Sequence, residues 1–209
     1  MYTLYYAPGS ANMLVHLTLL ELGAPYRLER IDLDAGQQRS AEYLKLNPDG
    51  VVPTLIVDGQ PHGEAAALAL LLTERHPDGG LAPAPGSAQR GEFLQRMFWF
   101  ANSLQPAFRQ WFYPGDFSHG HDDAIKDAAR AAIEAGWSRL HTHLATHGPY
   151  LLGDRFSLLD LYAIMLMRWS RNMPRPATSW PHLAAFAERI KARPSWPALC
   201  QAEGLVEWA

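Results

Sequence analysis

From Tyr2 to His76 the apolar and polar positions switch repeatedly between the two-residue period of a strand and the longer period of a helix. Strands are predicted over three segments, namely Tyr2–Tyr6, Tyr26–Leu33 and Pro53–Val57. The pair Asp58-Gly59 then indicates a hairpin into a short fourth strand. Helices are predicted over Ala11–Leu22, Arg39–Leu46 and Glu64–His76. This order predicts an α/β sheet of about four strands with one parallel crossover and a terminal hairpin.

The pattern changes after His76, where a Pro- and Gly-rich stretch indicates a domain boundary. Beyond it only helical periods are found, over Ala88–Phe112, Asp122–His147, Ser157–Ser170, Trp180–Arg193 and Trp196–Gly204. The sequence therefore predicts an α/β domain over residues 1–77, a linker over 78–87 and an all-helical domain over 88–209.

Composition narrows the classes of function. The chain has 209 residues, is 48% hydrophobic and carries a net charge of only −3, which excludes a disordered protein. Asp and Glu (21) outnumber Lys and Arg (18), so no nucleic-acid partner is expected. The single cysteine, Cys200, allows no internal disulfide and no cysteine-based metal cluster. Neither a signal peptide nor a membrane-spanning segment is predicted, and the expected location is the cytoplasm.

Three motifs, at Asn47–Pro53, Glu64-Ala65 and Phe156–Asp160, together with the order of the elements, resemble the cytosolic glutathione transferase superfamily. Asn47-Pro-Asp-Gly-Val-Val-Pro53 is similar to the segment that leads into a cis-proline in that family. Glu64-Ala65 resembles the acid-plus-serine motif that opens its third helix, with alanine in the serine place. Phe156-Ser-Leu-Leu-Asp160 resembles a capping box of its helical domain. The resemblance implies an N-terminal thioredoxin-like domain, a C-terminal helical bundle and glutathione as cosubstrate.

A glutathione site needs a backbone edge, an anion site and a carboxylate. The resemblance implies that Val52, before a cis bond to Pro53, pairs with the cysteinyl backbone of the peptide. It also implies that the helix start at Glu64 and Ala65 binds the γ-glutamyl carboxylate and the ammonium group. Alanine at position 65 lacks a hydroxyl that would donate one more hydrogen bond, at a cost of roughly 1–3 kcal/mol. The alternatives are an ordinary strand-opening proline and a glutamate that only caps its helix.

Three residues are candidates for holding the thiolate of glutathione. Ser10 ranks first, because it follows Pro8-Gly9 at the start of the first helix, although serine is also a preferred helix cap. Asn12 ranks second, because Ser10-Ala-Asn12 resembles the bacterial disulfide-handling branch. Tyr6 ranks third, because it ends the first strand, and the same argument applies to Tyr5. The alternative is that both pack in a core, as strand tyrosines more often do.

The second substrate and the assembly are implied by the resemblance alone. The first long helix of the helical domain is expected to line a hydrophobic substrate pocket, with Phe100, Phe108, Trp111 and Tyr113 as its aromatic residues. Ordinary core packing is the alternative for most of them. The resemblance also implies a homodimer.

The histidine group His141, His143 and His147 fits a solvated helix end better than a metal site, and no metal is expected. The leading hypothesis is a glutathione transferase that activates the thiol for attack on a small apolar electrophile in detoxification. A glutathione-dependent disulfide reductase or peroxidase, or an isomerase, of the same fold is the alternative. A non-catalytic transferase-like binding module is the hypothesis from another class, and Ala65 is the feature that supports it.

Overall fold

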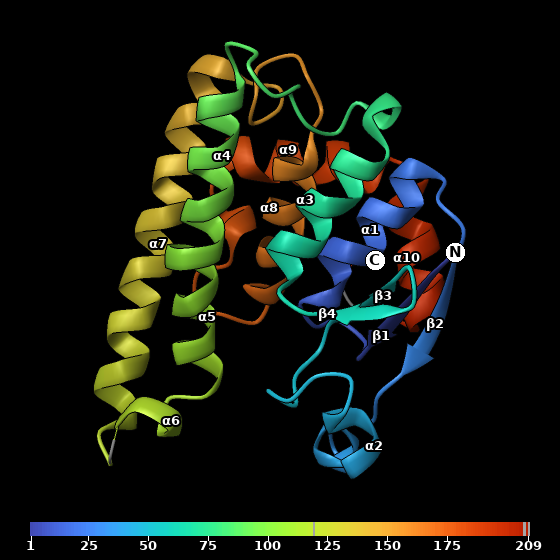
Figure 1. Ribbon diagram of the computed structural model, residues 1–209. Helices are drawn as coiled ribbons and strands as arrows, with labels where there is room; N and C mark the ends of the chain where they lie inside the picture. Colours follow the sequence, from blue (N-terminus) through green and yellow to red (C-terminus); the bar gives the residue numbers. More distant parts are fainter. Residues whose placement is uncertain (119, 207, 209) are drawn as a thin grey trace. The chain divides into compact units, whose positions relative to one another are not determined.

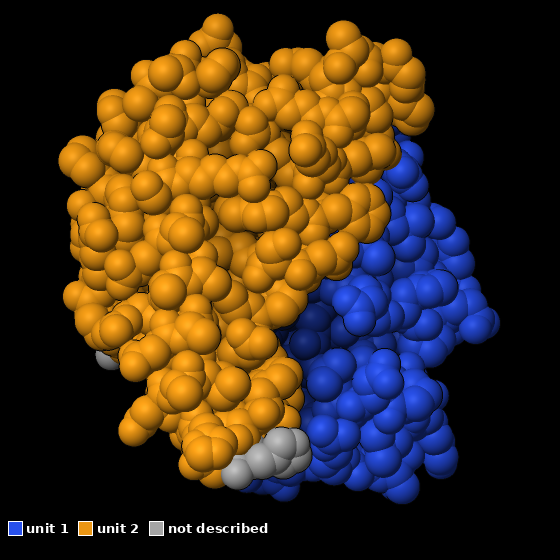
Figure 2. Space-filling view, turned by 90° about the vertical axis from the view of Figure 1, so that its left-hand side faces the viewer, with its two compact units in different colours: residues 1–82, 191–209 blue, residues 83–190 orange. Residues whose placement is uncertain are grey.

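The computed structural model describes residues 1–118, 120–206 and 208. The chain forms two compact units, which Figure 2 colours separately. We call residues 1–82 with 191–209 the sheet unit, and residues 83–190 the helical unit. The junction between Ala82 and Pro83 falls inside the linker that the sequence predicts over 78–87.

The sheet unit contains the mixed sheet that the strand pattern predicts. Its strands are β1 (Tyr2–Tyr6), β2 (Tyr26–Arg30), β3 (Thr54–Val57) and β4 (Gln60–His62), in the order β2-β1-β3-β4. β1 pairs with β2 in parallel, whereas the pairs β1-β3 and β3-β4 are antiparallel. Its helices are α1 (Asn12–Leu22), α2 (Ala41–Leu44), α3 (Ala65–Arg75) and α10 (Ser195–Glu203), with 3₁₀ turns at Gln37–Arg39 and Pro77–Gly79. The thioredoxin-like order of elements is confirmed.

The two faces of the sheet are covered by different helices. Leu4 and its cross-strand partner Leu55 are fully buried on one face, and Figure 1 shows α1 and α3 on one side of the sheet and α2 on the other. On the other face Tyr5 lies opposite Thr54, and its ring contacts Tyr43 of α2 with centroids 5.9 Å apart. Alternation along β1 therefore assigns successive side chains to different layers.

The C-terminal helix α10 packs against α1 and therefore belongs to the sheet unit. The sequence instead predicts one helical domain that runs unbroken over 88–209. The reason lies in the buried face of α10, since Trp196, Leu199, Cys200 and Glu203 follow the i, i+3, i+4, i+7 spacing and all are buried. An ion pair also joins the two elements, because Arg193 Nη2 lies 2.6 Å from Glu21 Oε2.

The helical unit is built from the long helices that the sequence predicts. They are α4 (Arg90–Trp99), α5 (Gln105–Phe112), α7 (Asp122–His147), α8 (Leu158–Trp169) and α9 (Pro181–Lys191), with a short α6 (Gly115–Ser118) and a 3₁₀ turn at Ala177–Ser179. α7 runs beside α5 (Figure 1). The predicted helix over Ala88–Phe112 is interrupted by a π-helical segment at Phe100–Leu104, just before Pro106, whose missing N–H breaks the regular ladder.

The capping box at the start of α8 is confirmed. Asp160 is fully buried, and its two carboxylate oxygens accept the N–H groups of Leu151 at 2.9 Å and Ser157 at 2.7 Å. Burial raises the pKa of Asp160 to about 7, against the opposing effect of these hydrogen bonds. The side chain thus fixes both the helix start and the loop before it.

No helix in the described part of the chain is both long and apolar enough to cross a lipid bilayer.

Candidate functional site

The turn that leads from β1 into α1 holds two of the three candidate catalytic residues. We call residues 7–12 the α1 entrance. The N–H of Ser10 donates to the carbonyl of Ala7 at 3.1 Å, and Gly9 adopts a φ of 74°, which favours glycine. Ser10 is half-buried. Ser10 is thus held in a tight turn and remains partly exposed.

The side chain of Asn12 holds this turn in place through hydrogen bonds. Its side chain is completely buried, and its Oδ1 accepts both the N–H of Ala7 at 3.0 Å and the hydroxyl of Ser10. Its Nδ2 donates to Oε1 of Glu203 at 2.9 Å. The amide of Asn12 is therefore engaged on both sides within the protein.

Glu203, from α10, joins this cluster and is only 4% exposed. Its Oε2 accepts the N–H of Gly9 at 2.8 Å, and its Oε1 lies 2.9 Å from Nδ1 of His16 as well as from the Asn12 amide. The other ring nitrogen of His16, Nε2, lies 2.9 Å from the hydroxyl of Tyr26 on β2. Burial, and then the charge of Glu203, raise the pKa of Tyr26 above its ordinary value.

These contacts separate the three catalytic candidates. The Ser10 hydroxyl does not cap the helix, because Ala11 holds the N-cap position and no side chain caps it. Asn12 lies in the interior, and its amide is bonded to Ala7, Ser10 and Glu203. Tyr6 is 8% exposed and shares the core face of β1 with Leu4. Of the three candidates, Ser10 is the one that is partly exposed.

The segment before β3 has the geometry expected of a peptide-binding edge. The Val52-Pro53 bond is cis, as the resemblance implies. Asn47 Nδ2 donates to the carbonyl of Val51 at 2.9 Å and to the hydroxyl of Thr54 at 3.1 Å, on either side of that bond. Within the described residues, neither the N–H nor the C=O of Val52 has a hydrogen-bond partner. Both are available to an extended ligand.

Residues 47–50 form the turn that supports this edge. The N–H of Gly50 donates to the carbonyl of Asn47 at 3.0 Å, and Gly50 has a φ of 61°. A Cβ at position 50 would lie 2.9 Å from the carbonyl oxygen of Gln38, so glycine is required for space as well as for conformation.

The start of α3 is open by comparison. We call residues 64–68 the α3 entrance. Glu64 precedes the helix with φ 65° and ψ 96°, a strained conformation for a residue with a side chain, and its exposed carboxylate makes no capping hydrogen bond. Ala65, the first helical residue, is 6% exposed, and no described residue accepts a hydrogen bond from its N–H. A helix start with unsatisfied N–H groups is suited to an anion.

Comparison with known proteins places these features in a family. The sequence profile of the glutathione S-transferase N-terminal domain matches residues 13–75, and that of the C-terminal domain matches residues 123–189. The chain belongs to the glutathione S-transferase family.

Full-length relatives agree with this placement. The chain is 30% identical over 207 residues to glutathione S-transferase GST-4.5 of Xanthomonas campestris pv. campestris, covering 97% of this chain and 98% of the relative. It is also 30% identical over 203 residues to the maleylacetoacetate isomerase of Dictyostelium discoideum, covering 93% of this chain and 92% of that protein. A sphingomonad glutathione S-transferase complexed with glutathione superposes with a TM-score of 0.85 at 30% identity, covering 98% of this chain and 100% of the other.

The aromatic residues expected in a glutathione transferase substrate pocket occupy different environments in the helical unit. Phe100 and Phe108 are completely buried. Phe100 packs on Tyr162 with ring centroids 5.2 Å apart, and Phe108 packs on Trp137 at 6.1 Å, which differs from the pocket role expected of both phenylalanines. Trp111 is half-buried and Tyr113 is 54% exposed, so these two are the better pocket candidates.

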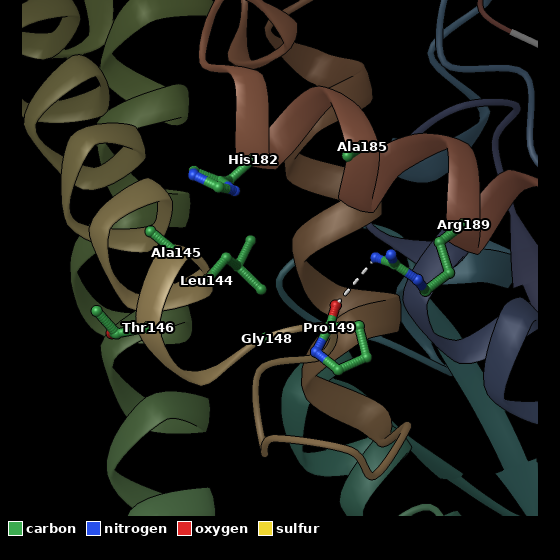
Figure 3. A pocket seen from close by; sticks show the side chains of 8 residues that line it. All are labelled: Leu144, Ala145, Thr146, Gly148, Pro149, His182, Ala185 and Arg189. Carbon is green, nitrogen blue, oxygen red and sulfur yellow. Dashed lines mark hydrogen bonds between the residues drawn. The ribbon is translucent and has the colours of Figure 1, made fainter.

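A surface pocket of about 310 Å³ lies elsewhere in the helical unit, at the C-terminal end of α7 (Figure 3). Its residues are Leu144, Ala145, Thr146, Gly148, Pro149, His182, Ala185 and Arg189. The guanidinium of Arg189 already donates to the carbonyl of Pro149 at 3.2 Å (Figure 3). None of the candidate catalytic or glutathione-binding residues lines this pocket.

His143 and His147, near this end of α7, contact each other and neighbouring residues. Nε2 of His143 lies 3.1 Å from the carbonyl of Leu151 and its Nδ1 lies 3.0 Å from Arg96, while its ring stacks on His147. Burial, and then the charge of Arg96, lower the pKa of His143. Residues 1–118, 120–206 and 208 contain no group of three or more His, Cys, Asp or Glu side chains placed to hold a metal ion.

Sequence reasoning missed Glu203, His16 and Tyr26. One signal for Glu203 was present: it stands at the seventh place after Trp196 on the buried stripe of α10, where an apolar residue would be ordinary. His16 likewise lies within a helix whose residues from Asn12 to Leu19 are all buried. Buried titratable residues in apolar stripes imply a polar partner, although the sequence does not name it.

Proposed function

We propose that this protein is a glutathione transferase in which Ser10 holds the thiolate of glutathione. The observation that carries the proposal is the Ser10 hydroxyl, which is half-buried at the start of α1 and anchored to a completely buried Asn12. A free thiol has a pKa of about 8.5, and a hydroxyl donor at a helix N-terminus lowers it by about one or two units. The hydroxyl of Ser10 is such a donor, and the start of α1 is the helix N-terminus beside it.

The remainder of glutathione is assigned to the cis-proline edge and the α3 entrance. The free N–H and C=O of Val52 would pair with the cysteinyl backbone. The open N–H of Ala65 would bind the γ-glutamyl carboxylate, and Glu64 would pair with the ammonium group. All of these groups belong to the sheet unit.

The reaction then follows from the charge on sulfur. The bound thiol releases its proton to water, and the Ser10 hydroxyl donates a hydrogen bond to the resulting thiolate. The sulfur electron pair forms the new carbon–sulfur bond, and an aryl or alkyl leaving group departs with its own electron pair. Ser10 remains uncharged throughout and forms no covalent bond.

The finer assignments belong to the same proposal. Trp111 and Tyr113 supply apolar surface for the electrophile, which is expected to be small and aromatic. A homodimer, a role in detoxification and a cytoplasmic location follow the family, and the single cysteine fits a reducing compartment.

Two alternatives use the same site. Isomerisation through a transient thioether is the second candidate, supported by the 30% identity to the Dictyostelium isomerase. A disulfide reductase or peroxidase is less well supported, because the Asn12 amide is bonded to Glu203 instead of facing the thiol.

Titration calorimetry with glutathione, and with S-hexyl-glutathione as second ligand, tests the proposal. We expect binding between micromolar and low millimolar strength, followed by turnover with chlorodinitrobenzene. Absence of heat from either compound at millimolar concentration would reject the enzyme and favour a non-catalytic binding module, the reading that Ala65 supports.

A further inference from the structure

The group that lies beneath the α1 entrance comes from the other end of the sequence. Glu203 is 191 residues from Asn12 along the chain, yet it contacts both the backbone and a side chain of the turn that carries Ser10. We infer that Glu203 is a positioning residue that fixes the orientation of the Asn12 amide and, through it, of the Ser10 hydroxyl. This inference rests on the proposed role of Ser10.

The chemistry of a carboxylate determines the orientation. An ionised carboxylate only accepts hydrogen bonds, so the group of Asn12 that faces Glu203 must be its NH₂. The carbonyl oxygen of the amide must then face the other way, toward the N–H of Ala7 and the hydroxyl of Ser10. If the amide were reversed, its NH₂ would meet the N–H of Ala7 and its oxygen would meet a carboxylate oxygen. Both contacts are repulsive.

The hydrogen bonds of His16 and Tyr26 agree with this orientation of the Asn12 amide and leave no polar group of the cluster unpaired. A neutral His16 with its proton on Nδ1 would donate to Glu203 and would accept the hydroxyl proton of Tyr26 at Nε2. A single neutral tautomer of the imidazole satisfies both contacts. The direction of donation therefore runs from Tyr26 through His16 to Glu203, and from Asn12 and Gly9 to the same carboxylate.

This orientation of the Asn12 amide also determines where the Ser10 hydroxyl donates its proton. While the site is empty, the hydroxyl donates to Oδ1 of Asn12 and presents its lone pairs outward, where the S–H of glutathione can donate. When the thiol loses its proton to water, the Ser10 hydroxyl rotates and donates to the thiolate. This exchanges a neutral hydrogen bond for a charge-assisted one, which is the stronger of the two. Glu203 fixes the geometry of that exchange, because its hydrogen bonds hold the Asn12 amide and the Gly9 N–H in place.

The variant Glu203→Gln tests the inference. Its shape is unchanged, but its NH₂ must face either the N–H of Gly9 or the two donors at Oε1, so at least one contact is lost. We expect the pKa of the bound thiol, read from the pH dependence of turnover and from the ultraviolet absorbance of the thiolate, to rise so that thiolate at neutral pH falls about five- to tenfold. The glutathione Kd should change less than about threefold, because the peptide is bound elsewhere.

Glu21→Gln is the matched control. Glu21 is also a largely buried carboxylate of α1 that contacts the C-terminal segment, through Arg193 and Ser195, but it touches no residue of the α1 entrance. Burial alone would raise the pKa of Glu21, and the hydrogen bonds from Arg193 and Ser195 overcome this and lower it. Its substitution should reduce stability and leave the thiol pKa unchanged.

The double variant with Ser10→Ala separates this inference from the proposed function. If Glu203 acts through Ser10, Glu203→Gln should not shift the thiol pKa further when Ser10 is alanine. A Ser10→Ala variant with normal thiol pKa would reject the role of Ser10 itself. A normal shift for Ser10→Ala but none for Glu203→Gln, or an equal shift for Glu21→Gln, would overturn the inference alone.

Tyr26→Phe carries the test if Glu203→Gln does not fold. Tyr26 lies half-buried on β2, and its loss removes the donor that fixes the tautomer of His16. We expect a shift in the same direction of about twofold to threefold in thiolate, again absent when Ser10 is alanine. A thiol pKa equal to that of the unmodified protein would overturn the inference by this route.

Discussion

The starts of α1 and α3 are two helix N-termini in one sheet unit, and they are built in opposite ways. At the α1 entrance every polar side chain beneath Ser10 has a partner, and four hydrogen bonds connect Ser10 to Tyr26 through Asn12, Glu203 and His16. At the α3 entrance Glu64 is exposed and strained, and the N–H of Ala65 is unsatisfied among the described residues. The polar side chains at the α1 entrance are hydrogen-bonded without a ligand, whereas the α3 entrance has groups that a ligand could pair with.

This difference separates two tasks in glutathione chemistry. Lowering a thiol pKa requires a donor held in one place, since a donor that moves away loses its effect as charge develops. Binding a flexible zwitterion requires unpaired groups that gain a partner on association. Substitutions at the α1 entrance should therefore reduce stability and turnover, whereas substitutions at the α3 entrance should change affinity.

Asn12→Ala should give the largest effect. It leaves the N–H of Ala7, the hydroxyl of Ser10 and the carboxylate of Glu203 each short of a partner in the interior. We expect the free energy of unfolding to fall by about 3 kcal/mol, measured by urea denaturation. The control Glu64→Ala should change it by less than about 0.5 kcal/mol, because the exposed side chain makes no capping bond. Equal losses would remove the contrast between the two helix starts.

Ser10→Ala should come next, through turnover. Losing the hydroxyl should raise the pKa of the bound thiol by about one or two units, so the rate with chlorodinitrobenzene at neutral pH falls about 10- to 100-fold. The rate should recover at high pH, where glutathione ionises without help. Calorimetry should show a nearly unchanged glutathione Kd. A large loss of affinity with a normal pH profile would instead make Ser10 a binding residue.

Glu64→Gln should weaken glutathione binding without touching the chemistry. Replacing the carboxylate removes its attraction for the ammonium group, and we expect about a tenfold higher Kd by calorimetry. The pH profile at saturating glutathione should match that of the unmodified protein. The discriminating result is a shifted thiol pKa, which would mean that the α3 entrance also acts on sulfur.

Ala65→Ser should produce the smallest change and the opposite sign. The added hydroxyl would donate one more hydrogen bond to the bound carboxylate, and we expect roughly fivefold tighter binding. Ala65→Val, which is larger but has no hydroxyl, is the matched control and should not improve affinity. Unchanged affinity in Ala65→Ser would place the γ-glutamyl carboxylate elsewhere.

Local motifs allowed much of this fold to be predicted. The Asp58-Gly59 hairpin and the capping box at Ser157 and Asp160 depend on neighbours in sequence, and the structure has both. The π-helical segment at Phe100–Leu104 was not predicted, because a helical period of apolar residues does not distinguish one extra residue in a turn.

The site shows the same limit. Short motifs predict Glu64, Ala65 and Pro53 as site residues, whereas Glu203 contacts the turn that carries Ser10 only because α10 returns to α1. A pattern of residue types also does not say which way the amide of Asn12 points. The structure gives its orientation through the three hydrogen bonds around it.

The position of α10 has a consequence for protein synthesis. The ribosome makes Glu203 191 residues after Asn12, on the order of 10–40 s later at about 5–20 residues per second. During that interval β1, α1 and β2 can assemble, but Gly9, Asn12 and His16 lack the carboxylate that joins them. The nascent sheet unit therefore carries an exposed apolar face on α1 and an unfinished turn, a state that suits chaperone binding. Because Glu203 lies in α10, the turn at Ser10 gains its last hydrogen-bond partner only after the rest of the sheet unit has been synthesised.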